Sequence, residues 1–552
     1  MERLKKHKEI LLILLLAAAI VLSAGLTSEV SVGDEICHYR FAKDMYAAGR
    51  RVPFDPLYTT GNPPGYFYNS EPFWSGLLAI LWRLTGNISL PLAQIYHTFY
   101  YLLLIVLTYL IGKQIYGKRE GLFAALLIAS APMVVSFSIL FYLDVPGTAF
   151  AALSLLLFLK KRYFLTGLGI SLMYFTRRNG CFLVPGFMLV LWLIDKESLI
   201  TKLKNSIFLI LPTAILAPID LRWRRIYVET TFTIPGIGKF TSGSTWEYIV
   251  SRLTKLMTKL IWGSGEYLNS SLINPRDVIQ YFGVALLVGL FLYFLFKKNK
   301  KEDLVLWACV ILYFVSFAYL FGITSDIRYI FPVIPLLCIL AGSSLKAIGN
   351  QRWIKVLIWT VCVLQLLTTA FYVHQKRLVP VGMKEGFEFI KQNTPVNALF
   401  MYPGYIFIEA TGRKFIWSSF FLIESLTMGK KYPTFDSSKD KSALMFWNNK
   451  EDDIKEILKV NKLHYIVIDK SRIYDDTKVK NFGGYPKSFV ERLPTLPLFK
   501  KIFENQAMSI WEVNREKSDG FSQRERGKDD RSERFPGPFA RKALRSFSKR
   551  SS

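Results

Sequence analysis

Two adjacent carboxylates, Asp34 and Glu35, follow a hydrophobic segment at 10–26 that is long enough to cross a bilayer. They therefore lie at or just beyond the membrane surface, where ionisable side chains are costly to desolvate and indicate a functional site. A carboxylate in this position can accept a proton as a general base. The alternative is an ordinary solvated loop whose acids mark a helix N-terminus, where negative charge is favourable.

The elements that must position these acids are membrane spans. The 552 residues are 51% hydrophobic and 15% aromatic, which predicts a polytopic α-helical membrane protein with a soluble part. Apolar segments and basic loops predict about eleven transmembrane helices and a cytosolic N-terminus. The predicted spans are 10–26, 92–116, 121–138, 143–160, 164–175, 181–194, 207–219, 278–296, 304–321, 330–348 and 354–372.

The net charge of +28 could suggest a nucleic-acid partner. Most basic clusters, however, fall in short loops on the predicted inner side, as the positive-inside rule requires, so the charge reports topology. A second set of acids and arginines lies at the outer ends of the predicted spans. Ordinary solvated loop charges would not need to lie on one face of the membrane, so this set indicates a site. This outer set comprises Asp34, Glu35, Asp144, Arg177, Arg178, Asp326 and Arg328.

The stretch 31–68 resembles a known family. An Asp-Glu pair in the first outer loop is the mark of the GT-C glycosyltransferases, which take a sugar from a polyprenyl-phosphate carrier. DEICH followed by FDPLYTTGNPPGYFY is most similar to the dolichyl-phosphoglucose α-1,2-glucosyltransferases of the endoplasmic reticulum, which have DEIFH, WDP, ITT and PGLY. The protein O-mannosyltransferases and the aminoarabinose transferases of lipid A share only the acidic pair and the architecture.

The resemblance implies catalytic roles for three acids. Asp34 would be the general base, and Glu35 would orient the acceptor or a cation. Asp144, in YLDVP, matches the second acidic position of the family at the outer end of the fourth span. A helix N-cap with Pro146 in the first turn is the alternative for Asp144, and the two roles can coexist.

The arginines are candidates for binding the carrier phosphate, because a guanidinium binds phosphate oxygens bidentately. Arg177 and Arg178 precede Asn179, where the glucosyltransferase family has Arg-Gln-Thr-Asn, and Asn179 becomes a candidate substrate contact. Arg328 opens a motif that resembles the Arg-Tyr-x-x-Pro entry of GT-C proteins, whose arginine faces the phosphate. Pairing with an acid is the alternative for each arginine. Further candidate substrate contacts are Asp326 and three tyrosines that could stack on sugar rings, Tyr58, Tyr66 and Tyr68.

The inferred reaction is a single displacement with inversion, which moves a hexose from a dolichyl or undecaprenyl phosphate carrier to a glycan, lipid or protein acceptor. Whether the reaction needs a divalent metal stays open, since the sequence shows no set of metal ligands beyond the acids. A transporter or lipid flippase is a second hypothesis, and it predicts charges near span centres and internal repeats. A non-catalytic membrane scaffold is a third.

The chain is predicted to divide into a transmembrane module at 1–373, an α/β domain at 382–515 and a disordered basic tail at 516–552. The α/β domain is predicted to have strands at 398–402, 465–469 and 509–513. The module has outer loops at 29–91 and 220–277. In the first, a short helix at 72–84 is expected in the membrane interface with Trp74 and Trp82 as anchors. In the second, an amphipathic run at 246–262 could lie on the membrane. A disulfide between Cys37 and Cys181 is left open, and the α/β domain is expected outside a plasma or endoplasmic-reticulum membrane.

Overall fold

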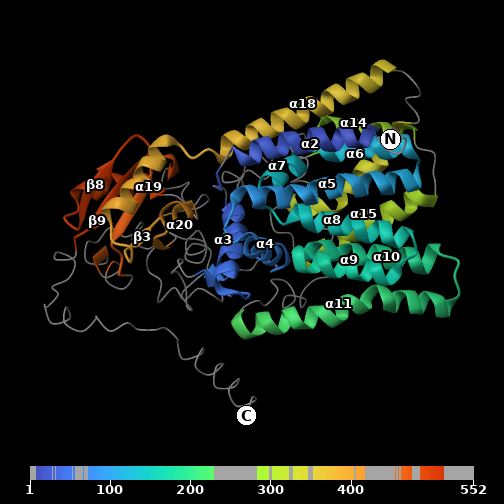
Figure 1. The fold of residues 1–552 in the computed structure, drawn as a ribbon, viewed down its shortest axis with the longest axis horizontal. Helices are drawn as coiled ribbons and strands as arrows, with labels where there is room; N and C mark the ends of the chain where they lie inside the picture. The colour runs from blue at the N-terminus through green and yellow to red at the C-terminus, as the bar shows by residue number, and fades with distance from the viewer. Residues whose placement is uncertain are drawn as a thin grey trace, which may run out of the picture.

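The computed structural model describes a helical bundle and an α/β body beside one end of it (Figure 1). The described ranges are 8–228, 282–296, 301–321, 327–345, 352–416, 454–474 and 485–514, with short gaps at 28, 31–32, 53, 56–65, 68–71, 403, 405, 456–457 and 459–461. The predicted amphipathic run at 246–262 and the basic tail lie outside these ranges.

The first half of the bundle is built from apolar helices joined by short loops, with the first outer loop folded into α3, α4 and a two-residue β pair. The elements are α2 (Lys8–Leu26), α3 (Gly33–Ala48), β1 (Phe54–Asp55), β2 (Tyr66–Phe67), α4 (Pro72–Thr85), α5 (Leu90–Ile115), α6 (Lys118–Ser130), α7 (Pro132–Ile139), α8 (Asp144–Leu159) and α9 (Tyr163–Thr176).

The rest of the bundle includes short irregular helical segments, of which η4 contains Pro332. The elements are η1 (Arg178–Leu183), α10 (Val184–Leu189), η2 (Val190–Ile194), α11 (Leu199–Val228), α14 (Val284–Phe296), α15 (Lys301–Phe321), η4 (Ile327–Val333), α16 (Ile334–Ser343) and α18 (Arg352–Arg377).

The predicted third span is a broken helix. α6 and α7 meet at an angle of 57°, because Pro132 has no N–H to donate and its ring blocks a continuous helix. The carbonyls released at the break are satisfied by other helices. The Tyr101 hydroxyl donates to the Ala129 carbonyl at 2.5 Å, and Nε2 of Gln365 donates to the Ser130 carbonyl at 2.7 Å.

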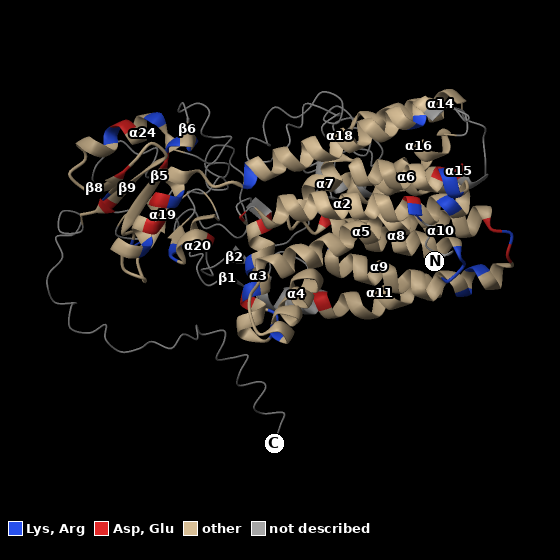
Figure 2. Ribbon diagram, turned by 45° about the horizontal axis from the view of Figure 1, so that its top comes forward, with Lys and Arg blue, Asp and Glu red and all other residues tan. Residues whose placement is uncertain are grey.

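Four described segments are long and apolar enough to cross a membrane, or five if the bent pair counts as one span; shorter apolar helices complete the bundle. The count of about eleven stays a prediction. Basic residues gather at the end of the bundle away from the α/β body (Figure 2). Lys118 there pairs with Glu9 at the start of α2, so the N-terminal helix begins at the basic end. A basic end is typical of a cytosolic face.

The α/β body contains a five-stranded sheet in the order β4-β3-β5-β9-β8. β3 is parallel to β4 and β5, whereas β9 is antiparallel to its neighbours. The predicted strands at 398–402, 465–469 and 509–513 are confirmed as β3, β5 and β9. The elements are α19 (Val381–Asn393), β3 (Leu399–Met401), α20 (Ile406–Thr411), β4 (Lys414–Ile416), β5 (Tyr465–Asp469), η6 (Lys470–Arg472), β6 (Ile473–Tyr474), β7 (Tyr485–Pro486), α24 (Lys487–Arg492), η7 (Leu493–Thr495), β8 (Phe499–Glu504) and β9 (Met508–Val513).

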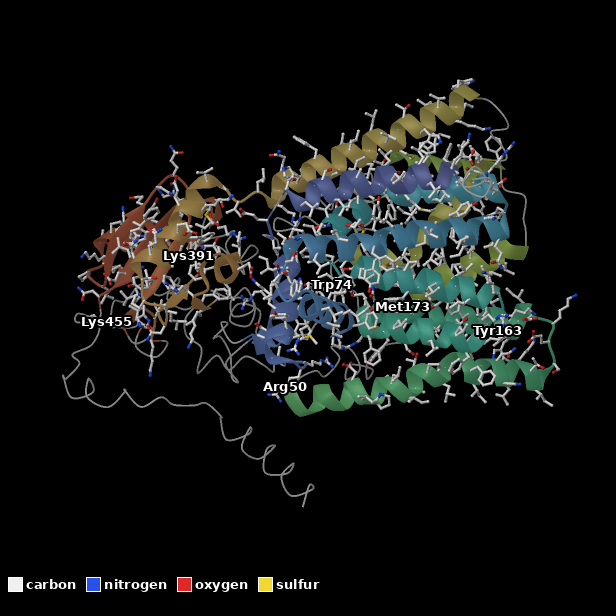
Figure 3. All side chains as sticks on the ribbon, in the orientation of Figure 1. Arg50, Trp74, Tyr163, Met173, Lys391 and Lys455 are labelled. Carbon is white, nitrogen blue, oxygen red and sulfur yellow. The ribbon has the colours of Figure 1, made fainter. Side chains whose placement is uncertain are left out.

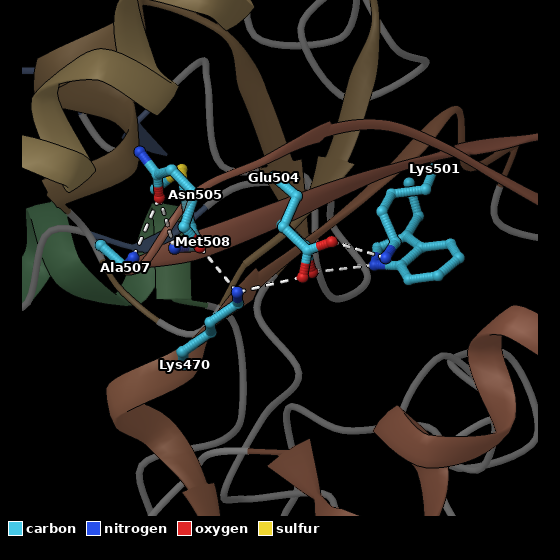
Figure 4. Close-up of polar contacts among 8 residues, drawn as sticks. Lys470, Lys501, Glu504, Asn505, Ala507 and Met508 are labelled. Atoms are coloured by element: carbon cyan, nitrogen blue, oxygen red, sulfur yellow. Dashed lines mark hydrogen bonds and ion pairs between the residues drawn. The ribbon is translucent and has the colours of Figure 1, made fainter.

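The turn between β8 and β9 attaches the sheet to α19. Asn505 Oδ1 accepts hydrogen bonds from the backbone N–H groups of Ala507 and Met508, and Lys470 bridges to Glu504 at 3.0 Å (Figure 4). The Asn505 amide also donates to the carbonyl of Gly382 at 2.7 Å. This asparagine therefore ties the β8–β9 hairpin to the first turn of the helix that covers it.

One prediction about the first outer loop is wrong in detail. The helix at 72–84 forms as α4, but Trp74 (labelled in Figure 3) and Trp82 are fully buried in the protein and do not anchor it in lipid. Cys37 and Cys181 do not form a disulfide with each other. α11 continues past the predicted start of the second outer loop at Asp220 and ends at Val228.

Candidate active site

The helix α3 carries the acidic pair at the end of the bundle nearest the α/β body (Figures 1 and 2). Glu35 is fully buried and its Oε1 accepts a hydrogen bond from Nη2 of Arg377 at 2.5 Å. Arg377 is the last residue of α18 and is equally buried. For Asp34 the structure describes only the backbone, as the second residue of α3. Glu35 is thus held by a buried ion pair with Arg377. The sequence analysis expected Glu35 to orient the acceptor or a cation and did not predict this pair.

The middle of α3 contacts both halves of the protein. Tyr39 stacks on Phe141 with ring centroids 5.7 Å apart, on the side of the bundle. Burial, reinforced by the nearby Glu409 carboxylate, raises the pKa of Tyr39 above its usual value, so it stays a neutral phenol. On the side of the α/β body, Glu409 of α20 pairs with Lys43 at 2.5 Å and with Arg40 at 3.7 Å.

Asp144 forms an ion pair with Arg177 where α8 begins and α9 ends. Nε of Arg177 lies 3.0 Å from Oδ1 of Asp144, whose side chain is only 1% exposed. Gly147 permits this approach, since a Cβ there would lie 2.6 Å from the Cβ of Arg177. The alternative N-cap role of Asp144 is wrong, because Leu143 is the N-cap residue and Asp144 is the first residue of the helix. A carboxylate in this first turn is still favoured by the helix dipole.

Arg178 pairs with a different acid, Asp220 of α11. The Arg178–Asp220 distance is 3.4 Å, and Arg51, just after α3, approaches the same carboxylate at 2.8 Å. The Tyr174 hydroxyl lies 3.5 Å from Asp220, and its ring lies 5.7 Å from the Arg178 guanidinium. The Asp220 side chain is 1% exposed, whereas Arg178 is 27% exposed. One buried acid therefore holds two arginines near the surface.

Asn179 lies in the interior below these arginines. Its side-chain amide donates to the Tyr313 hydroxyl at 3.4 Å, and the residue is 3% exposed. The turn η1 around it closes tightly on α9, because a Cβ at Gly180 would lie 2.4 Å from the sulfur of Met173 (labelled in Figure 3). In this structure Asn179 supports the turn that presents Arg177 and Arg178.

The remaining predicted site residues are described only in part. Arg328 lies in η4, whose first three residues are described by their backbone alone, and η4 packs against α8 and η1. Its backbone is therefore near the segments that carry Asp144 and Arg178. Tyr66 belongs to β2, where it pairs with Asp55. Tyr58, Tyr68 and Asp326 lie outside the described residues.

The structure thus brings together four of the predicted residues, Glu35, Asp144, Arg177 and Arg178, at one end of the bundle. It adds residues that the sequence analysis missed. Two of them had a signal, since Arg377 and Arg51 are cations on the predicted outer side, against the positive-inside bias. The missed residues are Arg51, Asp220, Arg377 and Glu409. Among the described residues, no group of three or more His, Cys, Asp or Glu side chains could hold a metal ion.

Comparisons with family models and with solved structures find matches to this chain. A family model described as dolichyl-phosphate-mannose-protein mannosyltransferase matches residues 70–223. The matched stretch includes Asp144, Arg177, Arg178 and Asp220. It begins after the stretch 31–68, so the closer similarity to the glucosyltransferases stays a prediction. A comparison with curated protein sequences finds no match.

Solved structures with the same architecture cover nearly the whole chain. ArnT from Cupriavidus metallidurans, bound to undecaprenyl phosphate, is 15% identical with a TM-score of 0.53, over 92% of this chain and 98% of that one. The chain has the GT-C fold. A GT-C oligosaccharyltransferase from Archaeoglobus fulgidus, tethered to an acceptor peptide with an NVT sequon, has a TM-score of 0.58 at 13% identity, over 93% and 75% of the two chains.

A second structure of the Archaeoglobus fulgidus enzyme, AglB with an inhibitory peptide and a dolichol-phosphate, is 14% identical with a TM-score of 0.51, over 84% of this chain and 70% of that one. The resemblance to GT-C glycosyltransferases that the acidic pair indicated is therefore confirmed. The family model and these solved structures agree on the GT-C fold of this chain.

Proposed function

We propose that the protein is an integral-membrane glycosyltransferase that moves a hexose from a dolichyl or undecaprenyl phosphate carrier to a glycan, lipid or protein acceptor. The observation that carries this proposal is the meeting of α3, with its acidic pair, and the ion pairs of Arg177 and Arg178 at one end of the GT-C bundle. The opposite, basic end would face the cytosol, which places the reaction on the outer or lumenal side.

Asp34 acts as the general base of a single displacement. It takes the proton of the acceptor hydroxyl while that oxygen attacks the anomeric carbon. The bond from the anomeric carbon to the phosphate oxygen breaks, and the carrier phosphate leaves with the electron pair, so the anomeric configuration inverts. Two consecutive residues of a helix project about 100° apart, so Glu35, which pairs with Arg377, has a separate role.

The arginines stabilise the charge that develops on the carrier phosphate. A guanidinium has five N–H donors, so one arginine can hold a carboxylate and a phosphate together. Asp144 and Asp220 would aim Arg177 and Arg178, while Arg51 shares Asp220 and leaves three cations against two carboxylates. Among the described side chains of this set, cations therefore outnumber carboxylates by one, which suits an anionic leaving group. Arg328 would add a further cation from η4.

Sugar contacts would come from the first outer loop and from the segment before η4. Tyr58, Tyr66 and Tyr68 supply aromatic faces for sugar rings, and Asp326 supplies a hydrogen-bond acceptor for hydroxyls. A divalent metal is not required by this scheme, because the arginines supply the positive charge at the phosphate.

The test is glycosyl transfer in membranes that contain the wild type, Asp34→Asn or Arg328→Ala. Labelled polyprenyl-phosphate glucose and mannose are offered in parallel with total lipid and glycan acceptors. We expect the wild type to transfer one sugar, and Asp34→Asn at equal protein level to abolish transfer. Glu29→Gln, which removes an exposed acid that precedes α3, is the control and should stay active.

The outcomes separate the parts of the proposal. Full activity in Asp34→Asn would show that the base is another acid, with Asp144 the next to test. Unchanged donor KM in Arg328→Ala would remove that arginine from the phosphate site. No transfer by the wild type from either donor would refute the proposed donor class.

A further inference from the structure

A buried joint connects the acidic pair to the last helix of the bundle. The Arg377 guanidinium bonds to Glu35 of α3 at 2.5 Å and to the carbonyl of Gly25 near the end of α2 at 3.3 Å. It also lies over the ring of Phe141, 5.6 Å from the centroid. The Arg377 side chain therefore contacts α3, the end of α2 and Phe141. α3 carries the acidic pair, α2 precedes it in the chain, and Phe141 lies three residues before Asp144.

The two charges in this joint are deeply buried. The side chains of Arg377 and Glu35 both have 0% exposure. A buried pair of this kind costs much desolvation energy and is weak evidence for stability, whereas its fixed geometry can specify one arrangement. The short, charge-assisted hydrogen bond sets the distance between the end of α18 and the first turn of α3.

The same joint lies next to the α/β body. Only residues 378–380 separate Arg377 from α19, the first helix of the body. The body also contacts α3 directly, through Glu409 with Lys43 and Arg40. α3 is thus held on one side by the end of α18 and on the other by α20, both of which belong to or adjoin the body.

We propose that Arg377 is a positioning residue: its ion pair with Glu35 sets where α3 begins and hence where the neighbouring Asp34 lies relative to the acceptor. This inference rests on the proposed function in one respect, the role of Asp34 as the general base. It assigns Glu35 to holding the helix instead of contacting the acceptor. It also means that the α/β body helps to position Asp34, because the body contacts α3 and adjoins the end of α18.

The experiment uses the full-length protein in lipid nanodiscs and two independent readouts. Hydrogen exchange of the α3 amides reports how firmly the helix is held, whatever the reaction is. Glycosyl transfer with a saturating acceptor gives kcat and the donor KM. The variants are Arg377→Met, Arg377→Lys and the doubly neutral Glu35→Gln/Arg377→Met, which leaves no uncompensated buried charge. Lys384→Met is the matched control, because it breaks the exposed pair of Lys384 with Glu29 that also joins α19 to the segment before α3.

We expect Arg377→Met to speed exchange in Gly33–Ala48 and to lower kcat by up to about 100-fold, the effect of misplacing a catalytic group by about 1 Å. The donor KM should change little, because the phosphate ligands are elsewhere. Arg377→Lys should restore part of kcat. The doubly neutral variant should regain thermal stability without regaining kcat, and Lys384→Met should match the wild type.

Two results would overturn the proposal. If the doubly neutral variant recovers both stability and kcat, the pair serves stability alone. If exchange in α3 is unchanged in a folded Arg377→Met protein, the pair does not hold the helix. If the wild type transfers no sugar while Arg377→Met loosens α3 selectively, the proposed function fails and the positioning role stands.

Discussion

Glu409 of α20 and Lys43 of α3 form an ion pair in which Oε1 and Nζ are 2.5 Å apart, although 366 residues separate them in the chain. Their side chains are 20% and 30% exposed, so the pair lies at the edge of a contact and not in a core. Arg40 approaches the second carboxylate oxygen at 3.7 Å. This carboxylate is a direct charged link between the α/β body and the helix that carries the acidic pair.

Reversing the charge at Glu409 should loosen this contact. In Glu409→Lys three cations would face one another, and we expect faster protease cleavage in the 378–380 connection. Adding Lys43→Glu should restore the wild-type rate, with a coupling energy of about 1 kcal/mol in a double-mutant cycle. If the second substitution gives no recovery, the two side chains do not interact in solution.

Enlarging Gly147 should separate α8 from the end of α9. A methyl group there must displace Arg177, so Gly147→Ala should destabilise the protein by about 1–3 kcal/mol and raise the donor KM. Thermal inactivation and initial rates measure the two effects. Gly76→Ala is the matched control, since its new Cβ would meet only the flexible end of Met45 at 3.3 Å. Equal effects in both variants would contradict a special role for the close approach.

Removing the carboxylate at Asp220 should release Arg51 and Arg178 from their shared anchor. We expect Asp220→Ala to cost about 1–3 kcal/mol of stability, because buried donors lose their acceptor, and to raise the donor KM. Tyr174→Phe removes only the 3.5 Å contact to the same acid and should have a smaller effect. A donor KM that stays at the wild-type value in Asp220→Ala would separate these arginines from the phosphate site.

The α/β body should lose stability in alkaline solution. Burial, followed by the nearby Asp469 carboxylate, raises the pKa of Tyr402 well above its usual value of 10.0. A folded-state pKa above the unfolded one contributes stability that is fully present below pH 10 and is lost as the pH rises further. The free energy of unfolding of the α/β body should therefore fall as the pH rises above 10. Tyr402→Phe should be less sensitive to pH there, at the cost of the 3.3 Å hydrogen bond to Asp469 at neutral pH.

Local pattern in the sequence was enough to predict many of the elements. The apolar segments at 143–160 and 164–175 form α8 and α9, and the strands around 400, 467 and 511 are close to their predicted bounds. These predictions succeed because a helix or strand displays its period within a few residues. The break of the third span was missed, although Pro132 marks it, because a proline at a helix start and one inside a helix look alike in a hydrophobic run.

The candidate site was predicted only in outline. The span count placed Asp144, Arg177 and Arg178 on one face, and the structure brings them to one end of the bundle. Which arginine meets which acid could not be predicted, since adjacent arginines pair with acids on two different helices. The burial of Trp74 and Trp82 was also missed, because an aromatic residue near an interface can face lipid or protein with the same local sequence.

The sequence by itself determined the helices, the strands and the kind of charged residue at each outer end. Only the tertiary structure decided the pairs, because Glu35 meets Arg377, Asp220 meets Arg51 and Glu409 meets Lys43 across 342, 169 and 366 residues. Hydrophobic period and turn chemistry are local properties of the chain. The partner of a buried charge is instead set by how distant helices pack, and the desolvation cost of an unpaired charge then selects the arrangement in which each acid finds its arginine or lysine.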